Sequence, residues 1–277
     1  MTNREILAAI SRVCALLILL TVSYLSTSAG AQRPAIQFHP DFAQFFKDAG
    51  TIGTIVVMDV HRQTVDVYNP ARADVLFPPA STFKILNSLI ALETGVVTDV
   101  DTQIFKWDGV DRGSAGWNKD LTLRSAFAIS AFHVYQQIAR DIGLETMTRY
   151  LDRVGYGTGE VTHENLDWFW VLKGFRISAN EQVQFLRRLY LEDLPFSRKT
   201  IATVKDISIV ERGEGYVLHG KTGWTTDTNP STGWFVGWIE RGDEASVFAL
   251  NMDMNEISQA PARITITKDI LKALDLL

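Results

Sequence analysis

The chain has 277 residues, of which 46% are hydrophobic and 21% charged, and its formal net charge is −5. This composition is typical of a globular protein that can bury a sizeable core, and the length suits one large domain or two interleaved subdomains. Because basic residues are not in excess, the chain lacks the positive field that binds nucleic acid. We therefore expect no nucleic-acid partner.

The N-terminus has the features of a secretory signal peptide. Arg4 and Arg12 provide a positive start, an apolar run of about ten residues follows from 13 to 22, and A-G-A at 29–31 resembles a signal cleavage site. The apolar run is too short for an ordinary membrane-spanning helix, and an uncleaved anchor is the alternative. We expect residues 1–31 to be removed.

Cysteine chemistry is excluded if this cleavage occurs. The one cysteine, Cys14, lies inside the apolar run, so the mature protein contains neither a thiol nor a disulfide. We therefore predict that residues 32–277 form a single catalytic domain in the periplasm, without membrane association after cleavage.

The first half of this domain begins with strands and continues with helices. Residues 54–58 and 64–67 are β-rich runs joined by a short polar connection, which predicts a hairpin. After a pair of prolines, residues 81–94 have a helical apolar face. Several helices and loops follow, and residues 180–191 form the clearest helix among them.

Strand signals return near the C-terminus, at residues 216–218, 234–238 and 245–251, and precede a helical tail at 264–277. Consecutive strands with short connections pair antiparallel. We predict an α+β fold, an α/β/α sandwich with helices flanking one antiparallel sheet. The sheet part takes residues 32–80 and 206–277, and the helical part, inserted between them, takes residues 81–205.

The motif S-T-F-K places a serine and a lysine one helical turn apart. At this spacing Ser81 and Lys84 share a helix face, near N–H groups that stabilise an anion. A serine hydroxyl needs a base to become nucleophilic, and an amine is a base only when neutral. Apolar neighbours such as Phe83 and Leu86 lower the pKa of a lysine by burial. On its own, the motif more often marks an N-cap serine and a surface lysine.

The motif K-T-G follows the strand signal at 216–218. Lys221 and Thr222 can bind a carboxylate, and Gly223 lets a substrate approach the backbone closely. The stretch that begins at Gly215 also matches the phosphate-loop pattern G-x-x-x-x-G-K-[ST]. A phosphate loop runs directly into a helix, which the residues after Gly223 cannot begin, so we reject a nucleotide site.

Ser130 lies between the two motifs and is a candidate for passing a proton to a leaving nitrogen. His133 suggests a Ser-His-Asp alternative, but a histidine in an apolar run is more often a packed residue. The sequence contains neither G-x-S-x-G nor H-E-x-x-H, so it supports neither a hydrolase elbow nor that zinc site. We expect no metal.

The two motifs together, in this order and about 140 residues apart, are typical of penicillin-recognising serine enzymes. From about residue 50 to about 275 the chain resembles one branch of them, the class D (oxacillinase-type) beta-lactamases. The resembling segments are 77–87, 106–109, 117–120, 135–137, 156–157, 176–178 and 221–224. The resemblance implies hydrolysis of a small-molecule beta-lactam through a serine acyl-enzyme, by a monomer or a homodimer.

The resemblance also assigns roles to residues. Ser81 is then the nucleophile, Ser130 relays a proton, and Lys84 is the general base as a carbamate of carbon dioxide, with no other cofactor. Trp170 supports the modified lysine, and Phe132 lies beside it. The substrate-binding residues are Lys221, Thr222, Gly223, Trp224 and Arg263, with the backbone N–H groups of Ser81 and Trp224 holding the oxyanion. An exposed helix-terminal charge is the alternative for Arg263.

The chain departs from the family pattern at three positions. Phe132 replaces a valine, Thr158 an asparagine, and Lys173 a glycine or asparagine. We expect Phe132 to change the packing around Lys84.

Two alternatives to a beta-lactamase share the motifs: a peptidoglycan transpeptidase or carboxypeptidase, and the antibiotic-sensing domain of a receptor. The first often has a further domain or an anchor and the second needs transmembrane helices, and we expect neither after residue 31.

Overall fold

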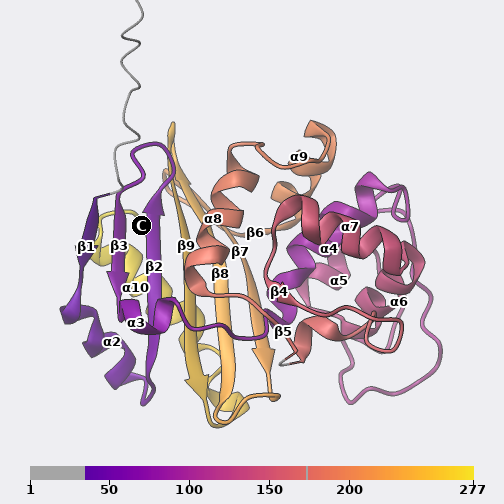
Figure 1. The fold of residues 1–277 in the computed structure, drawn as a ribbon, viewed down its shortest axis with the longest axis horizontal. Coiled ribbons are helices and arrows are strands. Elements are labelled where there is room, and N and C mark those ends of the chain that lie inside the picture. The colour runs from indigo at the N-terminus through magenta and orange to yellow at the C-terminus, as the bar shows by residue number, and fades with distance from the viewer. Residues whose placement is uncertain (1–34, 173) are drawn as a thin grey trace, which may run out of the picture. The chain divides into compact units, whose positions relative to one another are not determined.

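The computed structural model describes residues 35–172 and 174–277; the predicted signal peptide and Lys173 lie outside them. At the centre is a seven-stranded sheet in the order β1-β3-β2-β9-β8-β7-β6 (Figure 1). Its strands are β1 (Ile36–Phe38), β2 (Gly53–Asp59), β3 (Val65–Tyr68), β6 (Ile209–Gly213), β7 (Tyr216–Thr225), β8 (Ser231–Arg241) and β9 (Glu244–Met254). A small second sheet pairs β4 (Thr158–Gly159) with β5 (Phe175–Arg176).

Both ends of the chain contribute to the large sheet. Figure 1 shows the indigo strands β1 to β3 beside the yellow strand β9, and β2 pairs antiparallel with β9. The predicted hairpin is β2–β3, and β7, β8 and β9 form consecutive antiparallel pairs. At one edge, however, β1 pairs parallel with β3, so the sheet is mixed. The intervening helix and strand make a connection long enough to return the chain in the same direction.

Helices surround this sheet. They are α2 (Ala43–Asp48), α3 (Pro70–Ala73), α4 (Lys84–Glu93), α5 (Leu123–Ala128), α6 (Phe132–Ile142), α7 (Leu144–Val154), α8 (Ala179–Tyr190), α9 (Arg198–Ile207) and α10 (Ala262–Ala273), with short 3-10 turns η1 (Pro40–Phe42), η2 (Ala80–Phe83), η3 (Phe169–Val171) and η4 (Ile257–Gln259). The clearest predicted helix corresponds to α8, which begins where Ser178 Oγ accepts a hydrogen bond from Glu181 N (3.1 Å). No helix of the described residues is long and apolar enough to cross a membrane.

The alternating side chains of β2 show how the helices cover both faces of the sheet. Val56 and Met58 belong to the larger core, which includes the apolar side of α8. Ile55 and Val57 belong to a second core, which includes Ile270 of α10. The predicted α+β fold with flanking helices is therefore confirmed.

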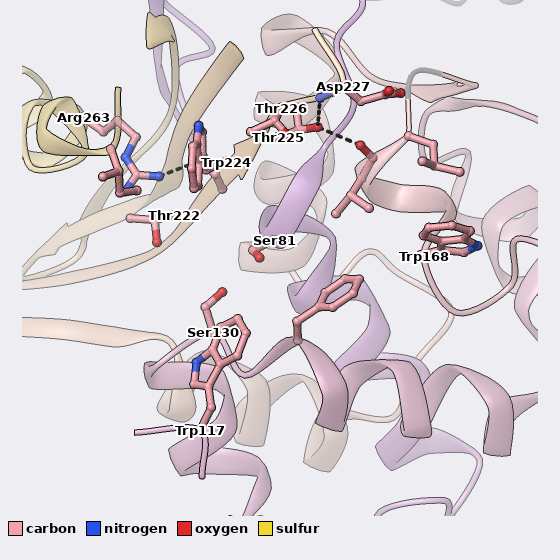
Figure 2. Close-up of a pocket in the computed structure, with 15 residues that line it drawn as sticks. Ser81, Trp117, Ser130, Trp168, Thr222, Trp224, Thr225, Thr226, Asp227 and Arg263 are labelled. Atoms are coloured by element: carbon pink, nitrogen blue, oxygen red, sulfur yellow. Dashed lines mark hydrogen bonds between the residues drawn. The ribbon is translucent and has the colours of Figure 1, made fainter. Parts of the chain in front are cut away.

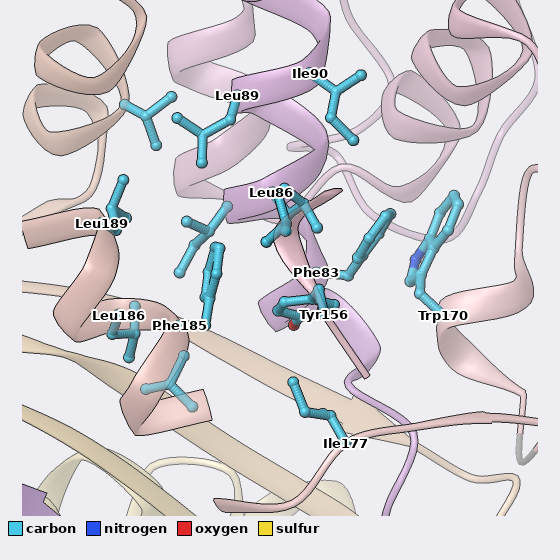
Figure 3. Packing of buried hydrophobic residues seen from close by; sticks show 14 of the residues in the cluster. Phe83, Leu86, Leu89, Ile90, Tyr156, Trp170, Ile177, Phe185, Leu186 and Leu189 are labelled. Carbon is cyan, nitrogen blue, oxygen red and sulfur yellow. The ribbon is translucent and has the colours of Figure 1, made fainter. Parts of the chain in front are cut away.

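Helix α4 lies inside the helical part of the molecule. Residues 84–91 are all buried, so this helix is enclosed on every side. Figure 3 shows Leu86 and Leu89 among the apolar side chains of the larger core, with Phe83 beside Trp170. This packing fixes η2 and the first turn of α4, which together carry the S-T-F-K motif.

Candidate active site

A cavity of about 550 Å³ lies between the end of β7 and the helical part. Figure 2 shows Ser81 near its centre, with Ser130, Thr222 and Trp168 around it. The lining residues are Ser81, Trp117, Ser130, Phe132, Trp168, Val171, Leu172, Thr222, Gly223, Trp224, Thr225, Thr226, Asp227, Ile257 and Arg263. The cavity thus brings together residues of both motifs that are far apart in the sequence.

Ser81 and Lys84 are in direct contact. Lys84 Nζ donates a hydrogen bond to Ser81 Oγ at 2.8 Å, and the Lys84 residue is 0% exposed. Burial lowers the pKa of Lys84 well below that of an ordinary lysine, and the charge of Lys221 lowers it further. A neutral amine has a lone pair, so in that state the hydroxyl can donate to the nitrogen instead. The expected nucleophile and base are therefore within hydrogen-bond reach.

The backbone before Ser81 is strained. Ser81 lies in the 3-10 turn η2, rather than in the first turn of an α-helix, and α4 begins at Lys84. Ala80 has a φ of +51°, a left-handed conformation that is uncommon for a residue with a side chain. Such conformations persist where the surrounding structure enforces them and are frequent at functional sites.

Aromatic side chains enclose the Lys84 amine. Lys84 Nζ lies 5.1 Å from the ring centroid of Tyr135 and 5.7 Å from that of Phe132. The Trp170 ring packs against Phe132 at 5.9 Å and stacks on Phe83 at 5.4 Å. Trp170 Nε1 is buried and has no hydrogen-bond partner among the described residues. We call Lys84, Phe132, Tyr135 and Trp170 the lysine pocket.

Ser130 lies in the turn between α5 and α6, with a φ of +59°. Its hydroxyl is buried, has no hydrogen-bond partner among the described residues, and belongs to the lining of the cavity. His133 is not among the lining residues, and burial lowers its pKa below the usual value. Ser130 therefore lies at the surface of the cavity, whereas His133 does not.

Two cations lie at the K-T-G side of the cavity. Arg263 lines it and donates from Nη1 to the Gly223 carbonyl at 2.5 Å. Lys221 is only 4% exposed and lies behind the lining, whereas Thr222 is part of it. Burial, and then repulsion by Arg263, lowers the pKa of Lys221 to about 7. Burial lowers the pKa of Arg263 to about 10, so the guanidinium stays charged at neutral pH.

Gly223 is closely packed and also lines the cavity. A Cβ at this position would lie 3.0 Å from the Pro79 carbonyl oxygen and 3.2 Å from Thr82 Cγ2. The turn that carries Ser81 therefore lies directly against β7. A side chain at Gly223 would require this turn or β7 to shift by a few tenths of an ångström.

Several lining residues were not predicted. Trp117, Trp168 and Ile257 are separate apolar side chains without periodicity, and Trp168 and Ile257 are 45% and 59% exposed. Trp117 lies in the resembling segment 117–120, whereas nothing in the sequence marked Trp168 or Ile257 as lining residues. Thr158 lies in β4, outside the lining. No group of three or more His, Cys, Asp or Glu residues within 35–172 and 174–277 is arranged to hold a metal ion.

Comparisons with known proteins agree with this geometry. Residues 53–274 match the family described as penicillin binding protein transpeptidase domain. Beta-lactamase OXA-5 of Pseudomonas aeruginosa is 40% identical over 91% of this chain and 94% of its own length. The crystal structure of a class D beta-lactamase, YbXI from Nostoc, has a TM-score of 0.83 and 43% identity, covering 85% of this chain and 99% of its own. The crystal structure of FUS-1 (OXA-85) of Fusobacterium nucleatum subsp. polymorphum, also a class D beta-lactamase, has a TM-score of 0.83 and 38% identity. It covers 87% of this chain and 100% of its own.

These matches extend over most of the domain, and they include both motifs. Residues of S-T-F-K and K-T-G line the same cavity, so the similarity includes the residues that could act on a substrate. The resemblance predicted from the sequence is therefore confirmed. The chain belongs to the class D beta-lactamases, serine hydrolases of the penicillin-recognising superfamily.

Proposed function

We propose that the protein hydrolyses the beta-lactam amide bond of penicillin-type antibiotics through an acyl-enzyme on Ser81. The observation that carries this proposal is the 2.8 Å contact between Ser81 Oγ and the buried Lys84 amine. Among the described residues, this contact joins a hydroxyl in a substrate-sized cavity to an amine whose pKa burial lowers, which favours its neutral, basic form.

Acylation follows from this arrangement. Ser81 Oγ forms a bond to the lactam carbonyl carbon while its proton passes to Lys84, the residue with which Oγ is in hydrogen-bond contact. The lactam C–N bond then breaks, and Ser130 relays the proton: it donates its own proton to the departing nitrogen and takes up the one that the lysine received from Ser81. The backbone N–H groups of Ser81 and Trp224 are the proposed donors to the oxyanion.

The substrate carboxylate binds at the K-T-G side. Lys221 and Arg263 supply positive charge there, and Thr222 supplies a hydroxyl in the cavity wall. A carboxylate in the cavity can form charge-assisted hydrogen bonds with Arg263, which are stronger than neutral ones, and the positive charge of Lys221 behind the lining adds to the attraction. With the carboxylate held there, the lactam carbonyl can be presented to Ser81.

We further propose that Lys84 reacts with carbon dioxide to form a carbamate. The lysine pocket fits this group, because only a neutral amine reacts with carbon dioxide and Trp170 Nε1 is a buried donor without a partner. When present, the carbamate supplies an anionic general base for the water that releases the acyl group. Trp170 would orient it by donating its N–H, and Phe132 and Tyr135 would exclude bulk water.

A transpeptidase or carboxypeptidase is the second candidate, since the matched family is described by a transpeptidase domain. Such an enzyme would form the same Ser81 adduct but release it slowly. Steady-state hydrolysis of nitrocefin distinguishes the two functions. We expect many turnovers for the wild type and none for Ser81→Ala at unchanged melting temperature. A single burst without turnover would support the second candidate instead.

We also propose that the protein acts in the periplasm, after cleavage behind the A-G-A sequence at 29–31. This proposal rests on the sequence, because these residues lie outside the described part. N-terminal sequencing of the exported protein should begin at Gln32. A mature protein that keeps Arg4 would contradict it.

A further inference from the structure

We propose that Thr225 is a positioning residue that ties the turn bearing Trp170 to the substrate-binding strand β7. Thr225 is the last residue of β7, and it is only 4% exposed. Its Oγ1 donates to the Val171 carbonyl at 2.7 Å (Figure 2). Val171 is the last residue of η3, and Trp170 directly precedes it. This inference rests on the proposed role of Trp170 beside a modified Lys84.

The direction of this hydrogen bond is determined by its partners. A carbonyl oxygen can only accept, so the Thr225 hydroxyl hydrogen points at Val171. The Asp227 backbone N–H donates to the same Oγ1 at 3.1 Å, which occupies a lone pair. Both hydrogen-bonding functions of the hydroxyl are therefore used, and the side chain is held in one orientation.

The turn η3 needs such an external partner. Its carbonyls at Trp168 and Phe169 accept hydrogen bonds from Val171 N and Leu172 N. The last carbonyls of a helical turn have no partner within the turn, and Val171 O is one of them. Thr225, which lines the same cavity at the end of β7, supplies that partner, so the position of η3 depends on the end of β7.

This link joins the two halves of the site. Strand β7 carries Lys221, Thr222 and Gly223, whereas η3 places the Trp170 indole in the lysine pocket. Strand β7 itself is held by its pairing with β8 along its whole length. Loss of the Thr225 hydroxyl should therefore displace the Trp170 turn and leave the K-T-G backbone in place.

The test compares two variants of Thr225. Thr225→Val keeps the shape of the side chain and removes the hydroxyl, whereas Thr225→Ser keeps the hydroxyl. The control is Thr228→Val, because the Thr228 hydroxyl forms its hydrogen bond with Thr232 Oγ1, within the same hairpin. We would measure the bicarbonate concentration that gives half-maximal nitrocefin turnover, the KM, and the carbon-13 carbamate signal with labelled bicarbonate. Melting temperatures would check folding, and Thr225→Ala replaces Thr225→Val if the latter does not fold.

Because a half-buried carbonyl that loses its hydrogen-bond donor is costly, we expect Thr225→Val to raise the half-activating bicarbonate concentration about fivefold or more. Its carbamate signal should weaken, its KM should stay within about twofold, and Thr225→Ser and Thr228→Val should resemble the wild type. If the carbamate signal of Thr225→Val equals that of the wild type, this inference alone is overturned. The same holds if Thr225→Val differs from the wild type only in KM. A wild type that turns over nitrocefin without any carbamate signal would overturn the lysine modification and this inference with it.

Discussion

Replacing Trp170 with phenylalanine should separate stability from activity. Trp170 is fully buried, so the smaller ring loses packing worth about 1 to 2 kcal/mol. The same change removes a buried N–H that has no partner among the described residues, which should stabilise the folded state by about 1 to 3 kcal/mol. The two effects are of similar size. In buffer free of carbon dioxide, the free energy of unfolding should therefore change by less than about 1 kcal/mol.

Trp238→Phe is the matched control. Trp238 is also fully buried, but its Nε1 donates to Glu240 Oε1 at 2.9 Å, in β8 and outside the cavity lining. Removing it loses the same packing and, in addition, a hydrogen bond to a partly exposed carboxylate. We expect a loss of about 2 to 4 kcal/mol, with nitrocefin turnover close to that of the wild type.

Urea unfolding and steady-state kinetics give both quantities. For Trp170→Phe we expect turnover to fall at least about tenfold, as an interaction with the modified lysine is lost, and an acyl adduct to accumulate during the reaction. Bicarbonate should stabilise the wild type against urea more than it stabilises Trp170→Phe. If Trp170→Phe turns over like the wild type, or is as unstable as Trp238→Phe in carbon dioxide-free buffer, the assignment of Trp170 is refuted.

Three further results are expected. Arg263→Ala should raise KM more than it lowers kcat, and an unchanged KM would exclude Arg263 from carboxylate binding. Because Lys221 binds as a cation and its pKa is about 7, kcat/KM for benzylpenicillin should fall as the pH rises through about 7; the same alkaline decline in Lys221→Met would refute this cause. Phe132→Val should raise the bicarbonate concentration for half-maximal activity, because it opens the lysine pocket to bulk water and removes the ring that packs against Trp170, and a lower requirement would contradict this.

Much of the fold could be predicted, because its main elements have strong local patterns. The β2–β3 hairpin and the run from β7 to β9 follow from β-rich segments with short connections. The parallel pairing of β1 could not be predicted, since β1 has only three residues and they show no alternation of burial. Its direction is decided by tertiary contacts with β3.

The candidate site divides in the same way. The spacing of Ser81 and Lys84 predicted their contact, because three residues make one helical turn. The 3-10 turn and the left-handed Ala80 could not be predicted, since they have no local sequence signal and the turn lies against β7 only in the assembled fold. The Tyr135 ring beside Lys84 and the Thr225 link to Val171 join separate segments, and such contacts depend on the assembled fold.

The central claim is that beta-lactam hydrolysis passes through an acyl-enzyme on Ser81 that the lysine pocket then releases. Time-resolved intact-protein mass spectrometry during benzylpenicillin turnover, with peptide mapping of the trapped sample, tests this directly. We predict a transient increase equal to the mass of the substrate, located on the peptide that contains Ser81, and a return to the unmodified mass once substrate is exhausted. Hydrolysis without an adduct, an adduct on another residue, or an adduct that persists would contradict the account.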